Sequence, residues 1–187
     1  MVKKHEIEWH WVKGHGSDLL NQRADALARK AREQISWVDE LPEDTARVFV
    51  KGTCRGNSGA GTWAVVIEMD EETEQASGAV DETTNNRMEL MAAIEGISRI
   101  PTGTSAQIVT ESDYLYQGAT LWINGWRQRG WKKKDGKPVS NLDLWQELDK
   151  LQQQRVISWQ SAKGVKDAAP RGLREVRQLA QEAKALT

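Results

Sequence analysis

The chain lacks most of the features that mark secreted, membrane-bound or disordered proteins. It has one cysteine, Cys54, among 187 residues, so no disulfide can form within it, and a reducing compartment suits it. No run approaches the ~18 consecutive apolar residues of a membrane-spanning helix, and residues 1–6 lack the apolar core of a secretion signal. Hydrophobic residues make up 39% and charged residues 28%, a balance that excludes wholesale disorder and a collagen-like fibre. We therefore expect a globular, cytoplasmic protein without a membrane partner.

The net charge of -1 conceals a strong internal asymmetry. Residues 51–111 carry ten acidic and four basic side chains, whereas residues 112–140 carry six basic and two acidic ones. An acidic body with one concentrated basic segment indicates a site that attracts cations beside a surface that binds polyanions. The alternative is that both charge runs are simply solvated surface.

Hydrophobic periodicity predicts a mixed α/β sheet after residue 46. Alternating or continuous apolar runs predict strands at residues 47–50, 62–69, 75–80, 106–110 and 156–159. Apolar side chains at helical spacing predict helices at residues 86–100, 113–128, 142–154 and 172–185. Three strands followed by alternating helices and strands favour the α/β class.

One strand–helix unit occurs at both ends of the chain. Residues 7–15 (IEWHWVKGH) align with residues 157–165 (ISWQSAKGV), and apolar positions of the helices that follow also match. The shared order of strand, turn and helix favours a partial duplication over chance. We therefore expect a duplicated unit at 1–36, a linker at 37–46 and the main domain at 47–187.

Several long motifs resemble, in order, those of the bacterial type of ribonuclease H. They are VFVKGTCRGNSG at 48–59, TTNNRMELMAA at 83–93, VTES at 109–112, WINGWRQRGWK at 122–132 and NLDLW at 141–145. The resemblance implies a ribonuclease H-like fold with a five-stranded mixed sheet flanked by helices, here preceded by the extra N-terminal unit. It also implies a hydrolase that cuts the RNA strand of an RNA/DNA hybrid, using two Mg²⁺ ions that four carboxylates hold, with Mn²⁺ as a substitute.

The resemblance places the family's metal-binding and catalytic positions on particular residues. Glu89 takes the position of the second carboxylate, and Glu111 takes the third, where the family has the shorter aspartate. Asp25, in the front copy of the repeat, takes the fourth. His15 takes the position of the family's mobile histidine. The implied metal ligands are therefore Glu89, Glu111 and Asp25.

The first carboxylate is missing, because Lys51 stands where the family has aspartate. A protonated amine cannot bind a metal ion, and acidic neighbours favour its charged form. We therefore expect an RNA/DNA hybrid-binding protein in which cleavage is lost or weak. One alternative is an active ribonuclease H endonuclease that tolerates Lys51. Another is a non-catalytic structural or self-association module, in which a homodimer exchanges the strand–helix unit.

The unit that completes the sheet decides the rest of the site. The rear copy has Val165 and Arg177 where the front copy has His15 and Asp25. Covalent order favours the rear unit, since its strand directly follows the helix at 142–154. Docking of the front unit stays open, because a ten-residue linker can span up to ~35 Å when extended.

The resemblance also implies two sets of nucleic-acid-binding residues. Short amides suit the 2′-hydroxyl of RNA, and the first set is Cys54, Asn57, Asn85 and Asn86. The second set matches a basic protrusion that binds phosphates of the DNA strand, and comprises Trp122, Trp126, Arg127, Arg129, Trp131, Lys132, Lys133 and Lys134. Trp122 and Trp126 are four residues apart on a predicted helix, a spacing that favours packing over nucleic-acid contact.

Overall fold

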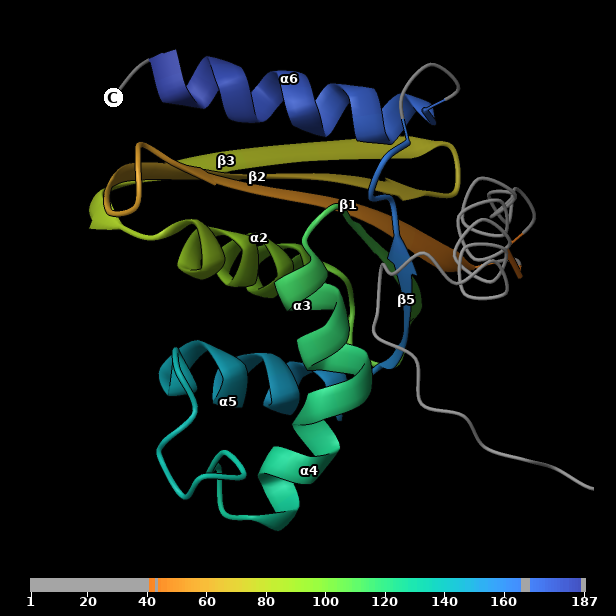
Figure 1. Cartoon of the computed structure of the whole chain (residues 1–187). Helices are drawn as coiled ribbons and strands as arrows, with labels where there is room; N and C mark the ends of the chain where they lie inside the picture. The colour runs from red at the N-terminus through yellow and green to blue at the C-terminus, as the bar shows by residue number, and fades with distance from the viewer. Residues whose placement is uncertain (1–40, 43, 166–168, 186–187) are drawn as a thin grey trace, which may run out of the picture. The chain divides into compact units, whose positions relative to one another are not determined.

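The structure, a computed structural model, describes residues 41–42, 44–165 and 169–185 (Figure 1). The predicted N-terminal unit, with Asp25 and His15, lies outside the described residues. From Pro42 onward the described residues belong to one unit. Within the described part of the chain, no helix is long and apolar enough to cross a lipid bilayer.

A mixed five-stranded sheet forms the centre of this unit (Figure 1). Its strands are β1 (Thr45–Cys54), β2 (Gly59–Met69), β3 (Glu72–Thr83), β4 (Ser105–Thr110) and β5 (Val156–Ser161), in the order β3-β2-β1-β4-β5. The first three strands pair antiparallel, whereas β4 and β5 continue the sheet in parallel with β1. The predicted mixed sheet is confirmed, and the rear copy of the repeat supplies its last strand, because β5 pairs with β4.

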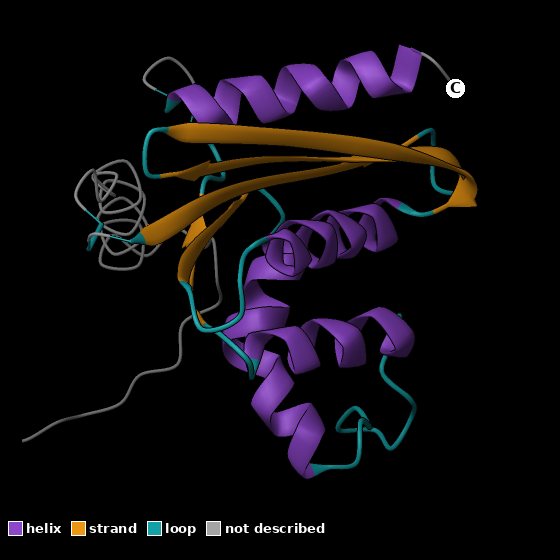
Figure 2. Ribbon diagram, turned by 180° about the vertical axis from the view of Figure 1, so that it is seen from behind, coloured by secondary structure: helices purple, strands orange, loops and turns teal. Residues whose placement is uncertain are grey.

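Helices cover both faces of the sheet (Figure 2). On one face, α6 (Arg171–Ala185) packs against the three antiparallel strands. On the other face, α2 (Asn85–Arg99) packs against β1 and β2, and α5 (Leu142–Gln152) packs against α2. The rear copy of the repeat therefore contributes both an edge strand and a helix that covers the sheet.

The predicted helix at 113–128 is interrupted. The chain forms α3 (Asp113–Gln117), a π-helical turn η1 (Gly118–Trp122) and α4 (Ile123–Gln128). A Cβ atom at Gly118 would lie 2.1 Å from the ring of Trp145, so glycine is what lets this segment run so close to α5. Hydrophobic periodicity does not report such a turn, because the apolar positions continue through it.

Strand alternation in β1 divides its side chains between the two faces of the sheet. Val48 and Val50 belong to the buried cluster on the α2 side. Phe49 points to the other face, where a Cβ atom at Gly172 of α6 would lie 2.2 Å from its ring. By the same alternation Lys51 projects to the α6 face. The first three strands are longer than predicted: β1 begins at Thr45, and pairing runs through glycine-rich positions that carry no hydrophobic signal.

Candidate active site

Three elements bring charged side chains together at one end of the sheet. Lys51 lies in β1 and Glu111 directly follows β4. These strands are parallel, with Val50 opposite Thr110, so residues 51 and 111 lie at the same end of the sheet. Arg177 reaches this point from α6, on the face to which Lys51 projects. Residues from β1, from the end of β4 and from the rear copy of the repeat, which are far apart in the sequence, thus meet at one site.

Glu111 is held between two cations, and we call these three residues the Lys51–Glu111–Arg177 cluster. The Nζ atom of Lys51 lies 2.9 Å from Oε2 of Glu111, and Nη2 of Arg177 lies 2.7 Å from Oε1. Nε of Arg177 donates a longer bond of 3.4 Å to Oε2. The side chains of Lys51, Glu111 and Arg177 are 25%, 20% and 28% exposed, so solvent still reaches the cluster.

The cluster holds Glu111 in its ionised form. Partial burial raises the pKa of Glu111, but the hydrogen bonds and charges of Arg177 and Lys51 outweigh it and leave the pKa below its ordinary value. Arg177 is itself positioned by a second bond, since Nη2 donates to the carbonyl oxygen of Val165 at 2.7 Å. Val165, which takes the family's histidine position in the rear copy, thus helps to position Arg177 through its backbone carbonyl group.

Glu89 lies beside this cluster but, unlike its three members, is almost fully buried. It is 3% exposed, and its Oε2 atom has no hydrogen-bond partner among the described residues. Burial raises the pKa of Glu89 from 4.5 to about 7, although the charge of Lys51 and a backbone hydrogen bond from Gly52 oppose the rise. A Cβ atom at Gly52 would lie 2.2 Å from the backbone nitrogen of Glu89, so this glycine allows the close approach of α2 to β1.

The described residues do not fit a pair of Mg²⁺ ions at this site. Mg²⁺ requires oxygen ligands in near-octahedral geometry, and the site offers two carboxylates together with an ammonium and a guanidinium. Within the described ranges, no group of three or more His, Cys, Asp or Glu side chains is placed to hold a metal ion. The structure places Glu89 near Glu111, but the positive charges bonded to Glu111 are those of Lys51 and Arg177.

Arg177 is the site residue that the motif analysis did not select. The repeat alignment placed it opposite Asp25, yet its role depended on which copy completes the sheet. Because the rear copy pairs with β4, Arg177 lies next to Glu111. Covalent order, with the rear strand following α5 directly, was the signal that could have selected it.

The first predicted set of nucleic-acid-binding residues lies at the end of β1, in the β1–β2 turn and at the start of α2. Asn57, in the β1–β2 turn, and Asn85 and Asn86, at the start of α2, are exposed. Cys54 is half-buried, with Sγ at 3.5 Å and 3.3 Å from the carbonyl oxygens of Gly59 and Thr83. The Sγ atom thus lies close to the first residue of β2 and the last residue of β3.

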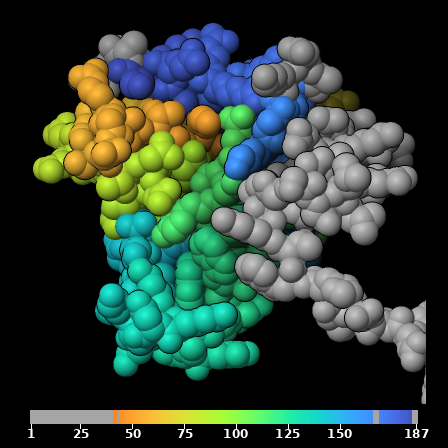
Figure 3. All heavy atoms as spheres, in the orientation of Figure 1, coloured from red at the N-terminus to blue at the C-terminus, as the bar shows by residue number. Residues whose placement is uncertain are grey.

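The second set lies on the last residue of η1, on α4 and on the loop that joins α4 to α5, which Figure 3 shows at the end of the described unit away from α6. Trp126 is 8% exposed and packs edge-on against Trp145 at 5.2 Å, with the half-buried Trp122 at 5.6 Å, so these rings pack the segment. Arg127 donates two hydrogen bonds to the buried Asp149. Trp131 and Lys133 are half-buried. The exposed cations of the set are Arg127, which is paired with Asp149, and Arg129, Lys132 and Lys134.

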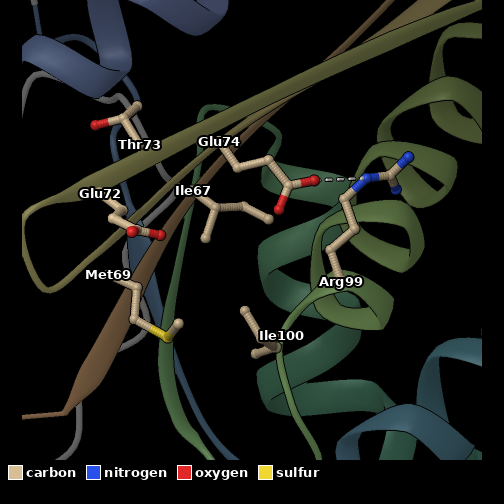
Figure 4. Close-up of a pocket in the computed structure, with 7 residues that line it drawn as sticks. All are labelled: Ile67, Met69, Glu72, Thr73, Glu74, Arg99 and Ile100. Carbon is tan, nitrogen blue, oxygen red and sulfur yellow. Dashed lines mark ion pairs between the residues drawn. The ribbon is translucent and has the colours of Figure 1, made fainter.

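A hollow lies on another part of the described surface (Figure 4). Glu74 and Arg99 form an ion pair across it at 3.4 Å, and Arg99 also lies over the ring of Trp63. Arg99 ends α2, whereas Glu89 lies near its start, so the hollow is not part of the candidate site. Its lining residues are Ile67, Met69, Glu72, Thr73, Glu74, Arg99 and Ile100.

Comparison with known proteins identifies the fold and its family. The RNase H family matches residues 43–184 of this chain. The chain belongs to the ribonuclease H family. Ribonuclease H of Maricaulis maris is 43% identical over 121 residues, which cover 64% of this chain and 81% of that protein. Ribonuclease H of Marinobacter nauticus is 38% identical over 138 residues, which cover 69% of this chain and 94% of that protein.

Solved structures of the ribonuclease H family share the fold. LC9-RNase H1, described as a type 1 RNase H with the type 2 active-site motif, superposes with a TM-score of 0.65 at 28% identity, covering 80% of this chain and 76% of its own. LC11-RNase H1 in complex with RNA/DNA hybrid superposes with a TM-score of 0.53 at 22% identity, covering 76% of this chain and 99% of its own. The second likeness bears on the fold alone. The predicted ribonuclease H-like fold and family are confirmed.

Proposed function

We propose that this ribonuclease H-family chain binds RNA/DNA hybrids and that the centre formed by its described residues does not cleave the RNA strand. The observation that carries the proposal is the Lys51–Glu111–Arg177 cluster, in which two cations of the protein hold the carboxylate that the family's pattern gives to a metal ion. Lys51 and Arg177 also stand at two positions where the family's pattern has carboxylates. The site therefore has fewer metal ligands and less negative charge for a metal ion to balance.

Support for hybrid binding comes from the exposed parts of the two predicted sets. Asn57, Asn85 and Asn86 offer amides near the carboxyl end of β1, where donor and acceptor groups suit a 2′-hydroxyl. The exposed cations of the α4–α5 segment offer phosphate contacts that carry no sequence information. Binding of this kind weakens steeply with salt.

A second candidate function is an active ribonuclease H. It is favoured by the relatives themselves, because proteins named ribonuclease H are about 40% identical to this chain over most of their length. On this account the metal ligands would be those that the motifs predict, Glu89 and Glu111 with Asp25, and His15 would take the role of the mobile histidine; Asp25 and His15 lie outside the described residues. Self-association through residues 1–36 stays a prediction.

One experiment separates the two candidates. The full chain is mixed with an RNA/DNA hybrid labelled on the RNA strand, in millimolar Mg²⁺ or Mn²⁺, and both binding and cleavage are followed. We expect salt-dependent binding without cleavage of the RNA strand. Ribonuclease H of Maricaulis maris serves as the positive control. Cleavage by this chain at a comparable rate would establish the second candidate, and absence of hybrid binding would overturn both.

A further inference from the structure

The cations of the cluster retain hydrogen-bond donors that Glu111 does not use. A lysine ammonium has three N–H donors and a guanidinium has five. Nζ of Lys51 makes one hydrogen bond, to Glu111, among the described residues. Arg177 uses Nε and Nη2, and its Nη1 atom makes no hydrogen bond among the described residues. Both side chains are about one quarter exposed, so a ligand in solution can approach them.

The charge at this site is suited to an anion. Lys51 and Arg177 carry two positive charges, and Glu111 balances one of them. Glu89 is buried at 3% exposure, so it presents little surface to a ligand. An anion with several oxygen acceptors can therefore bridge the free donors of Lys51 and Arg177, as phosphates do in charge-assisted hydrogen bonds.

We propose that Lys51 and Arg177 form a metal-free binding site for one phosphodiester group of the nucleic-acid backbone. The ligand is a backbone phosphate, bound directly by the ammonium and the guanidinium. This inference rests on the proposed function, because it concerns how the same site holds a hybrid. It adds the specific claim that hybrid affinity needs no divalent cation at this site, and that two residues outside the family's binding pattern contribute to it.

The test measures hybrid affinity by fluorescence anisotropy for the full chain in EDTA and in Mg²⁺. We expect equal wild-type affinity in both. The double variant Lys51→Gln/Arg177→Gln is expected to lose roughly 10- to 100-fold in affinity, since charged hydrogen bonds to one phosphate are removed. The slope of log affinity against log salt is expected to become shallower by about 1.

Lys163→Gln is the matched control. Lys163 is exposed, follows β5 and is paired with Asp113, so its replacement removes one positive charge close to the site without touching the cluster. We expect this variant to bind the hybrid within about 2-fold of the wild type, as is common for an isolated surface charge. A loss as large as that of the double variant would mean that the effect is general electrostatics, and would overturn the inference.

A second variant guards against loss of folding in the first. Glu111→Gln keeps both cations and removes the carboxylate that competes with phosphate, so we expect hybrid affinity in EDTA to rise, by about 3-fold or more. In Mg²⁺, a metal-bridged contact predicts the opposite sign for this variant, because Glu111 would then be a ligand. The inference is overturned if Glu111→Gln weakens binding, or if EDTA weakens wild-type binding. If the wild type binds no hybrid at all, the proposed function fails as well.

Discussion

The double variant Lys51→Asp/Arg177→Asp is expected to cleave the RNA strand of a hybrid in Mg²⁺ at least ~100-fold faster than the wild type. In the wild type, two cations surround Glu111 and no third carboxylate is present among the described residues of the site. The variant places aspartates at the family's first and fourth positions, beside Glu89 and Glu111. Four carboxylates repel one another unless divalent ions are bound. The two aspartates therefore supply metal ligands and also create a repulsion that bound metal ions relieve.

A folding readout accompanies the cleavage assay. Because Mg²⁺ would bind the folded double variant in preference to the unfolded chain, its Tm is expected to rise with Mg²⁺ concentration. Each single variant is expected to show a smaller effect, since one cation remains beside the carboxylates. Lys163→Asp makes the charge change of one single variant, outside the cluster, and is expected to gain neither cleavage nor stabilisation. A double variant that folds and binds hybrid but responds to Mg²⁺ in neither assay contradicts this account of the site.

Glu89→Gln is expected to become more stable, relative to the wild type, as the pH rises. A buried carboxyl whose pKa is raised from 4.5 to about 7 binds its proton more tightly in the folded state than in the unfolded chain. The free energy of unfolding of the wild type therefore falls as the pH rises through this interval. The amide does not titrate, so the stability difference between variant and wild type is expected to grow by about 2–3 kcal/mol from pH 5 to pH 8.

The measurement is denaturant unfolding of both proteins in EDTA at several pH values. Glu82→Gln, on an exposed part of β3, is the matched control, and its effect is expected to stay within about 0.5 kcal/mol at every pH. If the difference between Glu89→Gln and the wild type were independent of pH, Glu89 would be ionised throughout this interval and the description of its buried carboxyl would be wrong.

The sequence predicted the fold well because its main signals are local and ordered. The motifs around Gly52, Glu89 and Trp126 follow the family's order, and hydrophobic periodicity located all the strands of the described sheet. Strand ends were less well predicted: the start of β2 at Gly59 depends on pairing with β3, which no apolar pattern reports. The π-helical turn at Gly118 depends on the approach of Trp145, a tertiary contact.

The composition of the site could be predicted only in part. Lys51, Glu89 and Glu111 follow from their motif positions, and the structure places them together. Arg177 depends on a choice between two similar strand–helix units, which local sequence leaves open. The raised pKa of Glu89 depends on burial between α2 and β1, and the lowered pKa of Glu111 depends on two partners 60 and 66 residues away in sequence.

Lys51 and Arg177, which replace two of the family's carboxylates, act on the charge of the site together. Lys51 alone, facing the family's remaining carboxylates, would leave a net negative site that still attracts cations. With Arg177 as well, the site has two cations beside Glu89 and Glu111, and Glu111 is bonded by both. The two basic residues thus supply, as covalently attached charges, the positive charge that the family's pattern takes from metal ions, which is why we expect the described centre to be independent of divalent ions.

Titration of the wild-type full chain with Mg²⁺ in an isothermal calorimeter tests this claim most directly. The Lys51–Glu111–Arg177 cluster predicts no saturable binding heat, and Glu89→Gln and Glu111→Gln are expected to give the same flat titration. Saturable binding of Mg²⁺ by the wild type that disappears in both variants would contradict it, because Glu89 and Glu111 would then hold metal despite the two cations beside them.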